Sequence, residues 1–179
     1  MSAENRGFSG RISPEMITAI SAMFIGVCAL AVSLYEASLI REHQRASVWP
    51  NVELGYTYNQ DGLSMIIANT GIGPARIRHL AVEVDGQPIE HWGEMFERFE
   101  LPGENYLVTH VSRRVIPPNT ELHMLKVNPT GPIDELYRQS HRLSIRTCYC
   151  SVYEECWQME FGESSTPVVA CPDMDALDL

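Results

Sequence analysis

An uncharged stretch of twenty residues near the N-terminus constrains this chain more than any other feature. Residues 16–35 read MITAISAMFIGVCALAVSLY. At about 1.5 Å of rise per helical residue, the stretch reaches roughly 30 Å, the thickness of a bilayer's hydrocarbon core. A helix packed on a soluble domain normally keeps one polar face. The stretch therefore predicts one membrane-spanning helix in contact with the lipid bilayer.

Signals on both sides of this stretch predict where the helix begins and ends. Ser13 is a suitable cap and Pro14 suits the first turn, while Pro50 stops any helix that continues past Arg45. We expect an N-terminal tail at 1–13, the transmembrane helix at 14–40 and a juxtamembrane stalk at 41–50. The membrane anchor is expected to include Met16, Phe24, Gly26, Leu30 and Tyr35.

Processing, orientation and pairing of this helix leave alternatives open. Residues 29–31 resemble a signal-peptidase site and Cys28 lies in a stretch near a lipoprotein box, but the apolar run continues past both, so an uncleaved anchor is the preferred interpretation. Two arginines precede the helix and two follow it, and the cysteines of the C-terminal part favour an N-in, C-out orientation. Ala22 and Gly26 lie one turn apart, as in helix pairs that form homodimers.

The net negative charge of the chain comes entirely from the residues after the helix. From Ala46 onward there are nine Lys and Arg against nineteen Asp and Glu, a net charge of −10, whereas residues 1–45 balance at four and four. This excess argues against a nucleic-acid partner and against a polybasic lipid-binding surface. We expect one soluble domain at 51–170 and an acidic C-terminal tail at 171–179.

Alternating apolar and polar residues predict that this domain is mainly β. Turn signals at 59–62, 85–86 and 117–119 separate the apolar runs. About seven short strands of this kind predict an immunoglobulin-like β-sandwich, preceded by the one transmembrane helix. The expected strands cover residues 52–58, 63–69, 77–84, 106–115, 121–127, 143–152 and 156–161.

Two helical patterns interrupt the strands, at 92–99 and at 132–140. In the first, the apolar residues fall at i, i+3, i+4 and i+7, which forms one stripe. The stripe has two interpretations: a helix that docks a partner, or a lid that covers the open backbone of a sheet edge. Its residues are Trp92, Met95, Phe96 and Phe99.

The glycine-rich segment at 71–76 resembles a phosphate-binding loop only superficially. Such a loop needs a helix N-terminus behind it, and here Pro74 and a strand pattern follow. We therefore expect Gly71 and Gly73 to allow positive φ angles where the chain crosses between strands.

Four cysteines give the strongest local signal. In the hairpin at 143–161 the alternation places Cys148, Cys150 and Cys156 on one face, and a register sum of 306 sets Cys150 opposite Cys156 across a loop at 152–154. Opposite Cβ atoms lie about 4.5–5.5 Å apart, close to disulfide geometry. The predicted pairs are therefore Cys150 with Cys156 and Cys148 with Cys171.

Two alternatives for these cysteines stay open. A zinc site could use Cys148, Cys150, Cys156 and Cys171, although their spacing lacks the C-x2-C pairs of common structural sites. Free thiols would suit a cytoplasmic domain, whereas disulfides suit an oxidising compartment. No cofactor is expected.

No catalytic constellation is recognisable. The chain has neither a G-x-S-x-G elbow nor an H-E-x-x-H motif, and its histidines are scattered. The pairs Arg113–Arg114 and Glu154–Glu155 look like solvated surface charge. We expect a protein that is not an enzyme.

Two short motifs resemble those of uncharacterised bacterial single-pass membrane proteins. Residues 43–50 match an H-x-R-x-S-V-x-P segment next to the membrane, and residues 69–75 match an N-x-G-x-G-P-A stretch of the β domain. The resemblance implies a bacterial envelope protein with a β-sandwich, and with the N-in, C-out orientation we expect an inner-membrane protein whose C-terminal domain is periplasmic. It assigns no activity and no site residue.

Together these features predict an interaction protein. The first hypothesis is a membrane-anchored β-sandwich that acts as a protein-interaction module or as an accessory subunit of a membrane complex, its partner being another membrane or envelope protein. The second is a tethered domain that senses a metal or another ligand through its cysteines.

Overall fold

The computed structural model describes residues 13–103 and 106–172 of the chain. The chain divides into two compact units, residues 1–44 and residues 45–179, which are described separately. The N-terminal tail expected at 1–12 and the residues of the acidic tail from 173 onward lie outside the described residues.

Helix α1 covers Pro14–Ala46 and makes up the described part of the first unit. Its last residues, Arg45 and Ala46, belong to the second unit. Ser13 begins it as expected: its carbonyl oxygen accepts from the backbone N–H groups of Met16 and Ile17 at 2.9 and 3.2 Å. The helix is long and apolar enough to cross a bilayer, and none of its residues is buried within the chain. One helix therefore covers the residues expected to span the membrane and the first part of the expected stalk, and the span itself stays a prediction. The pairing of two helices through Ala22 and Gly26 stays a prediction.

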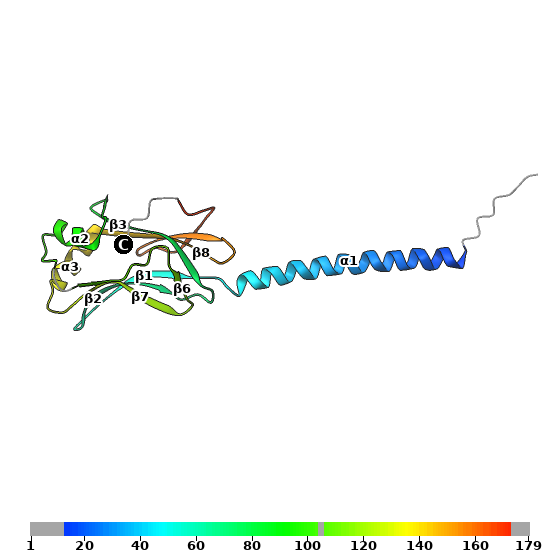
Figure 1. The fold of residues 1–179 in the computed structure, drawn as a ribbon, viewed down its shortest axis with the longest axis horizontal. Coiled ribbons are helices and arrows are strands. Elements are labelled where there is room, and N and C mark those ends of the chain that lie inside the picture. Colours follow the sequence, from blue (N-terminus) through cyan, green and yellow to red (C-terminus); the bar gives the residue numbers. More distant parts are fainter. Residues whose placement is uncertain (1–12, 104–105, 173–179) are drawn as a thin grey trace, which may run out of the picture. The chain divides into compact units, whose positions relative to one another are not determined.

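The second unit is built from two antiparallel sheets (Figure 1). One sheet has the strand order β1-β2-β7-β5. The other has the order β10-β9-β8-β3-β4, with β6 pairing to β3 off this path. The strands are β1 Val52–Asn59, β2 Gly62–Asn69, β3 Ala75–Val84, β4 Gln87–Pro88, β5 Tyr106–Val108, β6 Val115–Ile116, β7 Thr120–Val127, β8 Leu143–Cys150, β9 Cys156–Glu160 and β10 Thr166–Val168.

The strand order agrees with the predicted type of sandwich. The order β1-β2-β7-β5 corresponds to strands A, B, E and D of a constant-type immunoglobulin domain, and β9-β8-β3 corresponds to G, F and C. The expected mainly-β domain after one long apolar helix is confirmed. It lacks the inter-sheet disulfide of antibody domains, because both of its disulfides join β8 to β9 or to the segment after β10.

Two short helices close one end of the sandwich (Figure 1), α2 at Trp92–Arg98 and α3 at Ile133–Gln139, the latter followed by the 3-10 turn Ser140–Arg142. The partner-docking interpretation of the apolar stripe is wrong, because its four side chains are at most 3% exposed and belong to the core. Arg98 of α2 donates to the carbonyl oxygens of Gln87 and Pro88 at 3.0 Å. The helix therefore covers open backbone groups of β4, as a lid does.

Two boundaries differ from the prediction. The strand expected at 106–115 is two short strands, β5 and β6, in different sheets. The stretch has apolar residues at both ends and Val111 between them, but Val111 lies in the core where the chain crosses between the sheets. The domain also continues beyond residue 170, since Cys171 is bonded to Cys148. The predicted boundary between domain and tail was placed too early.

Hydrogen bonds of one buried asparagine, Asn69, hold the segment through which the chain enters the domain. The side chain of Asn69 is buried, accepts from the backbone N–H groups of Asn51 and Gly71, and donates to the carbonyl oxygens of Gly73 and Ile116. Gly71 and Gly73 do not adopt the expected positive φ. They are needed for close approach: a Cβ on Gly73 would lie 1.7 Å from the carbonyl oxygen of Val48.

Candidate functional site

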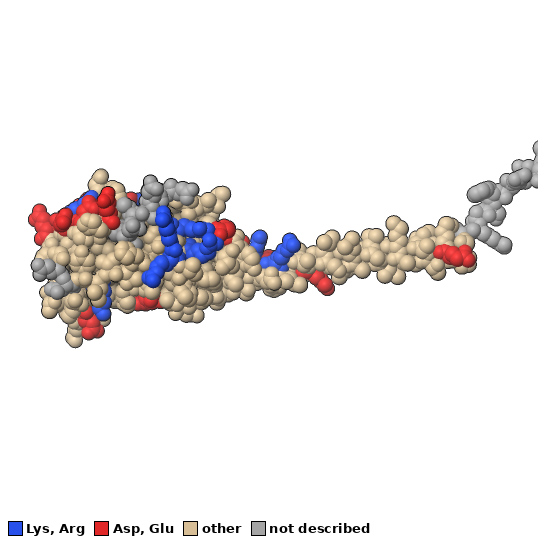
Figure 2. All heavy atoms as spheres, in the orientation of Figure 1, with Lys and Arg blue, Asp and Glu red and all other residues tan. Residues whose placement is uncertain are grey.

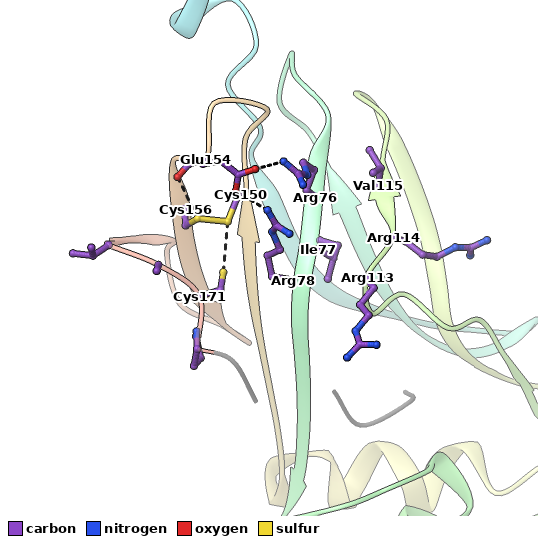
Figure 3. A pocket seen from close by; sticks show the side chains of 13 residues that line it. Arg76, Ile77, Arg78, Arg113, Arg114, Val115, Cys150, Glu154, Cys156 and Cys171 are labelled. Atoms are coloured by element: carbon purple, nitrogen blue, oxygen red, sulfur yellow. Dashed lines mark hydrogen bonds and ion pairs between the residues drawn. A yellow bond between two sulfur atoms is a disulfide. The ribbon is translucent and has the colours of Figure 1, made fainter. Parts of the chain in front are cut away.

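A hollow of about 650 Å³ opens on the outer face of the β3-β8-β9 sheet (Figure 3). Its floor comes from the start of β3 and the hairpin of β8 and β9. One wall is the loop that precedes β6, and the other is the segment after β10. The lining residues are Arg76, Ile77, Arg78, Arg113, Arg114, Val115, Cys150, Glu154, Cys156, Val169, Ala170, Cys171 and Pro172.

Strand pairing brings these segments together. Arg76 lies opposite Val115 of β6 on one side and opposite Cys150 of β8 on the other. The backbone N–H of Ile77 donates to the carbonyl oxygen of Arg114 at 2.8 Å, which fixes the loop before β6 beside β3. The arginines of the loop and of the strand therefore face one hollow although almost forty residues separate them along the chain.

The arginines of β3 share a single carboxylate. Both Arg76 and Arg78 pair with Glu154, the Arg78 Nη2 to Oε2 distance being 2.6 Å. Glu154 lies at the tip of the hairpin with a φ of 60°. The hydrogen bond from Arg78, together with the charges of both arginines, holds the pKa of this carboxyl below its usual value of 4.5.

The arginines of the loop have no carboxylate partner among the described residues. Arg113 is exposed and unpaired there, and Arg114 donates to the carbonyl oxygen of His110 at 3.2 Å. By contrast, each arginine of the domain outside the hollow forms an ion pair with a carboxylate: Arg98 with Glu94, Arg138 with Glu135, Arg142 with Asp85 and Arg146 with Glu83.

The hollow is therefore a positive site on an acidic domain. Four guanidinium groups and one carboxylate line it, whereas the chain from Ala46 onward carries a net charge of −10. Figure 2 shows Lys and Arg side chains gathered in one area of the visible face of the domain. A guanidinium presents a planar set of donors that matches a carboxylate or phosphate. The arrangement can thus bind an anionic group.

The four cysteines beside the arginines form the two predicted disulfides, Cys148–Cys171 and Cys150–Cys156. The predicted register is also confirmed, with Cys150 opposite Cys156. Because Cys148, Cys150, Cys156 and Cys171 are all in disulfide bonds, none of these four is a thiolate, so the zinc and free-thiol alternatives for them do not describe this state. Cys28 of α1 is a free cysteine.

The two disulfides touch each other. The Sγ atoms of Cys150 and Cys171 lie 3.7 Å apart (Figure 3). Neither sulfur carries a proton, so this is a van der Waals contact and not a hydrogen bond. Cys150, Cys156 and Cys171 all line the hollow, which places sulfur and guanidinium groups on the same surface.

A buried histidine lies beside Cys148. His79 of β3 is directly opposite Cys148 of β8 and is only 6% exposed. Its Nδ1 makes no hydrogen bond within the described part of the chain. Burial, and then the charge of Arg146, lower the pKa of His79 below its ordinary value of 6.5.

Sequence reasoning found the sulfur half of this site and missed the charged half. Arg113 and Glu154 were interpreted as solvated charge, because their neighbours in space come from other strands. A signal was present in the register: the predicted pairing of Cys150 with Cys156 puts Glu154 at the hairpin tip. Nothing in the sequence indicated that β6 would pair with β3.

Comparison of the chain with protein-family models, with curated proteins and with solved structures found no match. The site is therefore interpreted from its own geometry.

Proposed function

We propose that this chain is a single-pass membrane protein whose β domain binds an acidic segment of a partner protein in the arginine-lined hollow. The carrying observation is that four arginines and a single carboxylate, Glu154, line one hollow, in a domain whose other arginines are all neutralised. In this role the protein is an interaction module or an accessory subunit of a membrane complex.

The electrostatics of the hollow support an acidic occupant. The pairing of Arg76 and Arg78 with Glu154 shows, within the molecule, the contact that a ligand carboxylate would make. Arg113, which is unpaired among the described residues, offers a guanidinium for a second acidic side chain. Because the hollow is open, it suits a segment of chain rather than an enclosed small molecule.

The anchor and the disulfides support a location. Helix α1 is long enough to span a bilayer, and its uninterrupted apolar run supports an uncleaved anchor over a signal sequence. Disulfides form and persist in oxidising compartments. The two disulfides thus support a domain outside the cytoplasm, in the periplasm of a bacterium as the motif resemblance implies.

Peptide binding tests the proposed recognition. The full chain in mild detergent is titrated against a fluorescein-labelled peptide of alternating glutamate and glycine, with the lysine counterpart as control. We expect anisotropy to rise only with the glutamate peptide, and salt to weaken the binding. Arg113→Gln with Arg114→Gln should weaken it about ten-fold or more, since each hydrogen bond to a charged group contributes about 1.5–3 kcal/mol.

Two further variants sharpen the test. Glu154→Gln removes the carboxylate that already occupies Arg76 and Arg78, so it should strengthen binding of the glutamate peptide. Arg138→Gln is a matched control, because Arg138 is an exposed arginine outside the hollow. Equal binding of both peptides, or equal effects of Arg138→Gln and the loop variants, would contradict the proposal.

Thiol labelling tests the proposed location. Intact cells are treated with a membrane-impermeant maleimide, with and without prior reduction. Labelling of the domain only after reduction is expected for disulfides outside the cytoplasm. Labelling that requires lysis would place the domain in the cytoplasm.

A further inference from the structure

The four sulfur atoms beside the arginines differ in access. Cys148 and Cys150 are buried and Cys156 is nearly so, whereas Cys171 is partly exposed and lines the hollow. A thiolate that enters the hollow therefore reaches Cys171 first. Attack on that sulfur breaks the Cys148–Cys171 bond and makes Cys148 the leaving sulfur.

The leaving sulfur has a basic neighbour. His79 lies opposite Cys148 in the register of β3 and β8, and directly opposed side chains have Cβ atoms about 4.5–5.5 Å apart. The imidazole is buried and its Nδ1 is unpartnered among the described residues. A buried polar atom without a partner is unfavourable in the resting protein. It gains a role once a thiolate forms beside it.

The arginines of the hollow also select among attacking thiols by their charge. The arginines that line the hollow with Cys171 would attract a thiol that carries a carboxylate and repel one that carries an ammonium group. We propose that the Cys148–Cys171 disulfide is a thiol–disulfide exchange site for carboxylate-bearing thiols, with His79 as a proton relay beside the leaving sulfur. The thiol preference rests on the proposed anion binding by the arginines; the exchange at Cys171 does not.

The step balances as follows. The thiolate sulfur bonds to Cys171 Sγ, the Cys148–Cys171 bond breaks, and its electron pair goes to Cys148. The Cys148 thiolate then takes up a proton from solvent, relayed by the His79 imidazole beside it, and becomes a thiol. A second thiolate of the same kind attacks the small-molecule sulfur of the mixed disulfide, and Cys171 is the leaving sulfur. The two small thiols leave as an oxidised dimer, Cys171 takes up a proton from solvent, and Cys148 and Cys171 remain as two reduced cysteines.

A panel of three small thiols tests the site. The full chain with Cys28→Ala, in mild detergent, is treated with mercaptoacetate, 2-mercaptoethanol or cysteamine, each at the same thiolate concentration. Samples are quenched, alkylated and mapped by mass spectrometry, which reports the pair that opened. We expect Cys148–Cys171 to open before Cys150–Cys156, and mercaptoacetate to react about ten-fold or more faster than cysteamine.

Variants separate the parts of the site. Arg113→Gln with Arg114→Gln should reduce the preference for mercaptoacetate, and Arg138→Gln should leave it unchanged. His79→Gln should slow all three thiols by about ten-fold or more and keep the order among them. Opening of Cys150–Cys156 first, or equal rates for the three thiols, would overturn the proposal.

The outcomes also distinguish this site from the proposed function. If the glutamate peptide binds and the thiols show no preference, the proposed selectivity for carboxylate-bearing thiols is wrong and the recognition module stands. If mercaptoacetate is preferred and the peptide does not bind, the exchange site stands and recognition of an acidic segment is wrong. Failure of both would remove the arginine hollow as an anion site.

Discussion

Removing each disulfide in turn should destabilise the domain by different amounts. Cys148–Cys171 joins residues 23 apart in the sequence, whereas Cys150–Cys156 joins residues 6 apart. A cross-link restricts the unfolded chain more when the closed loop is longer. The chain-entropy relation gives about 3.4 kcal/mol for the first bond and about 2.2 kcal/mol for the second. The difference between the two variants is therefore about 1.2 kcal/mol.

The comparison is a fair one because both variants lose similar packing. Cys148 and Cys150 are buried neighbours on β8, so paired alanine substitutions remove a comparable buried group in each case. Urea unfolding of the full chain in mild detergent, followed by tryptophan fluorescence, reports the free energy of unfolding, with Trp92 as a buried probe. Cys28→Ala serves as the control and should not shift the midpoint.

The result has a clear refutation. If the variant without Cys150–Cys156 is as destabilised as the variant without Cys148–Cys171, or more so, loop length does not govern the contribution of these bonds. Unequal slopes against urea would show that the denatured states differ in compactness. The argument from the unfolded chain would then be wrong for this domain.

Three further perturbations test other parts of the fold. Phe96→Ala should lower the free energy of unfolding by about 3–5 kcal/mol, measured in urea, because the ring is fully buried. Gly73→Ala should destabilise the domain and lower its melting temperature, because the new Cβ would overlap the carbonyl oxygen of Val48. Burial, with Arg146 nearby, lowers the pKa of His79 below 6.5. The unfolded chain therefore binds the proton more readily, and the stability that neutral His79 contributes is full above pH 6.5 and is lost as the pH falls below it. Urea midpoints at neutral and mildly acidic pH should differ less in His79→Gln than in the native chain.

Local patterns predicted the parts of the fold that depend on nearby residues. The alternation of Val52, Leu54 and Tyr56 predicted β1, and the hairpin register predicted the Cys150–Cys156 disulfide, which left Cys148 to pair with Cys171. The crossing at 109–114 was not predicted, because Val111, which enters the core between the two sheets, resembles an inward-facing position of one longer strand. Apolar patterning also left the role of the stripe at Trp92 open, since a buried lid and an exposed docking helix share it.

The charged half of the site depends on contacts between distant segments. Arg113 and Arg76 come together only because β6 pairs with the first two residues of β3. A strand of two residues leaves almost no periodic signal. The Cys150–Cys156 disulfide was predictable because both cysteines belong to one hairpin, whereas the arginine hollow follows from tertiary pairing alone.

If a partner binds in the hollow as proposed, the polar contacts of Asn69 lie where a pulling force would enter the domain. The segment at 48–51 is held by residues 69–73, which lead directly into Ala75 and Arg76 at the start of β3. A partner held in the hollow would grip the same end of the sandwich through which the chain enters. Tension between the membrane helix and that partner would therefore pass through a few residues at this end. The core and the far helices would carry almost none of it, and the complex could be pulled without unfolding the domain.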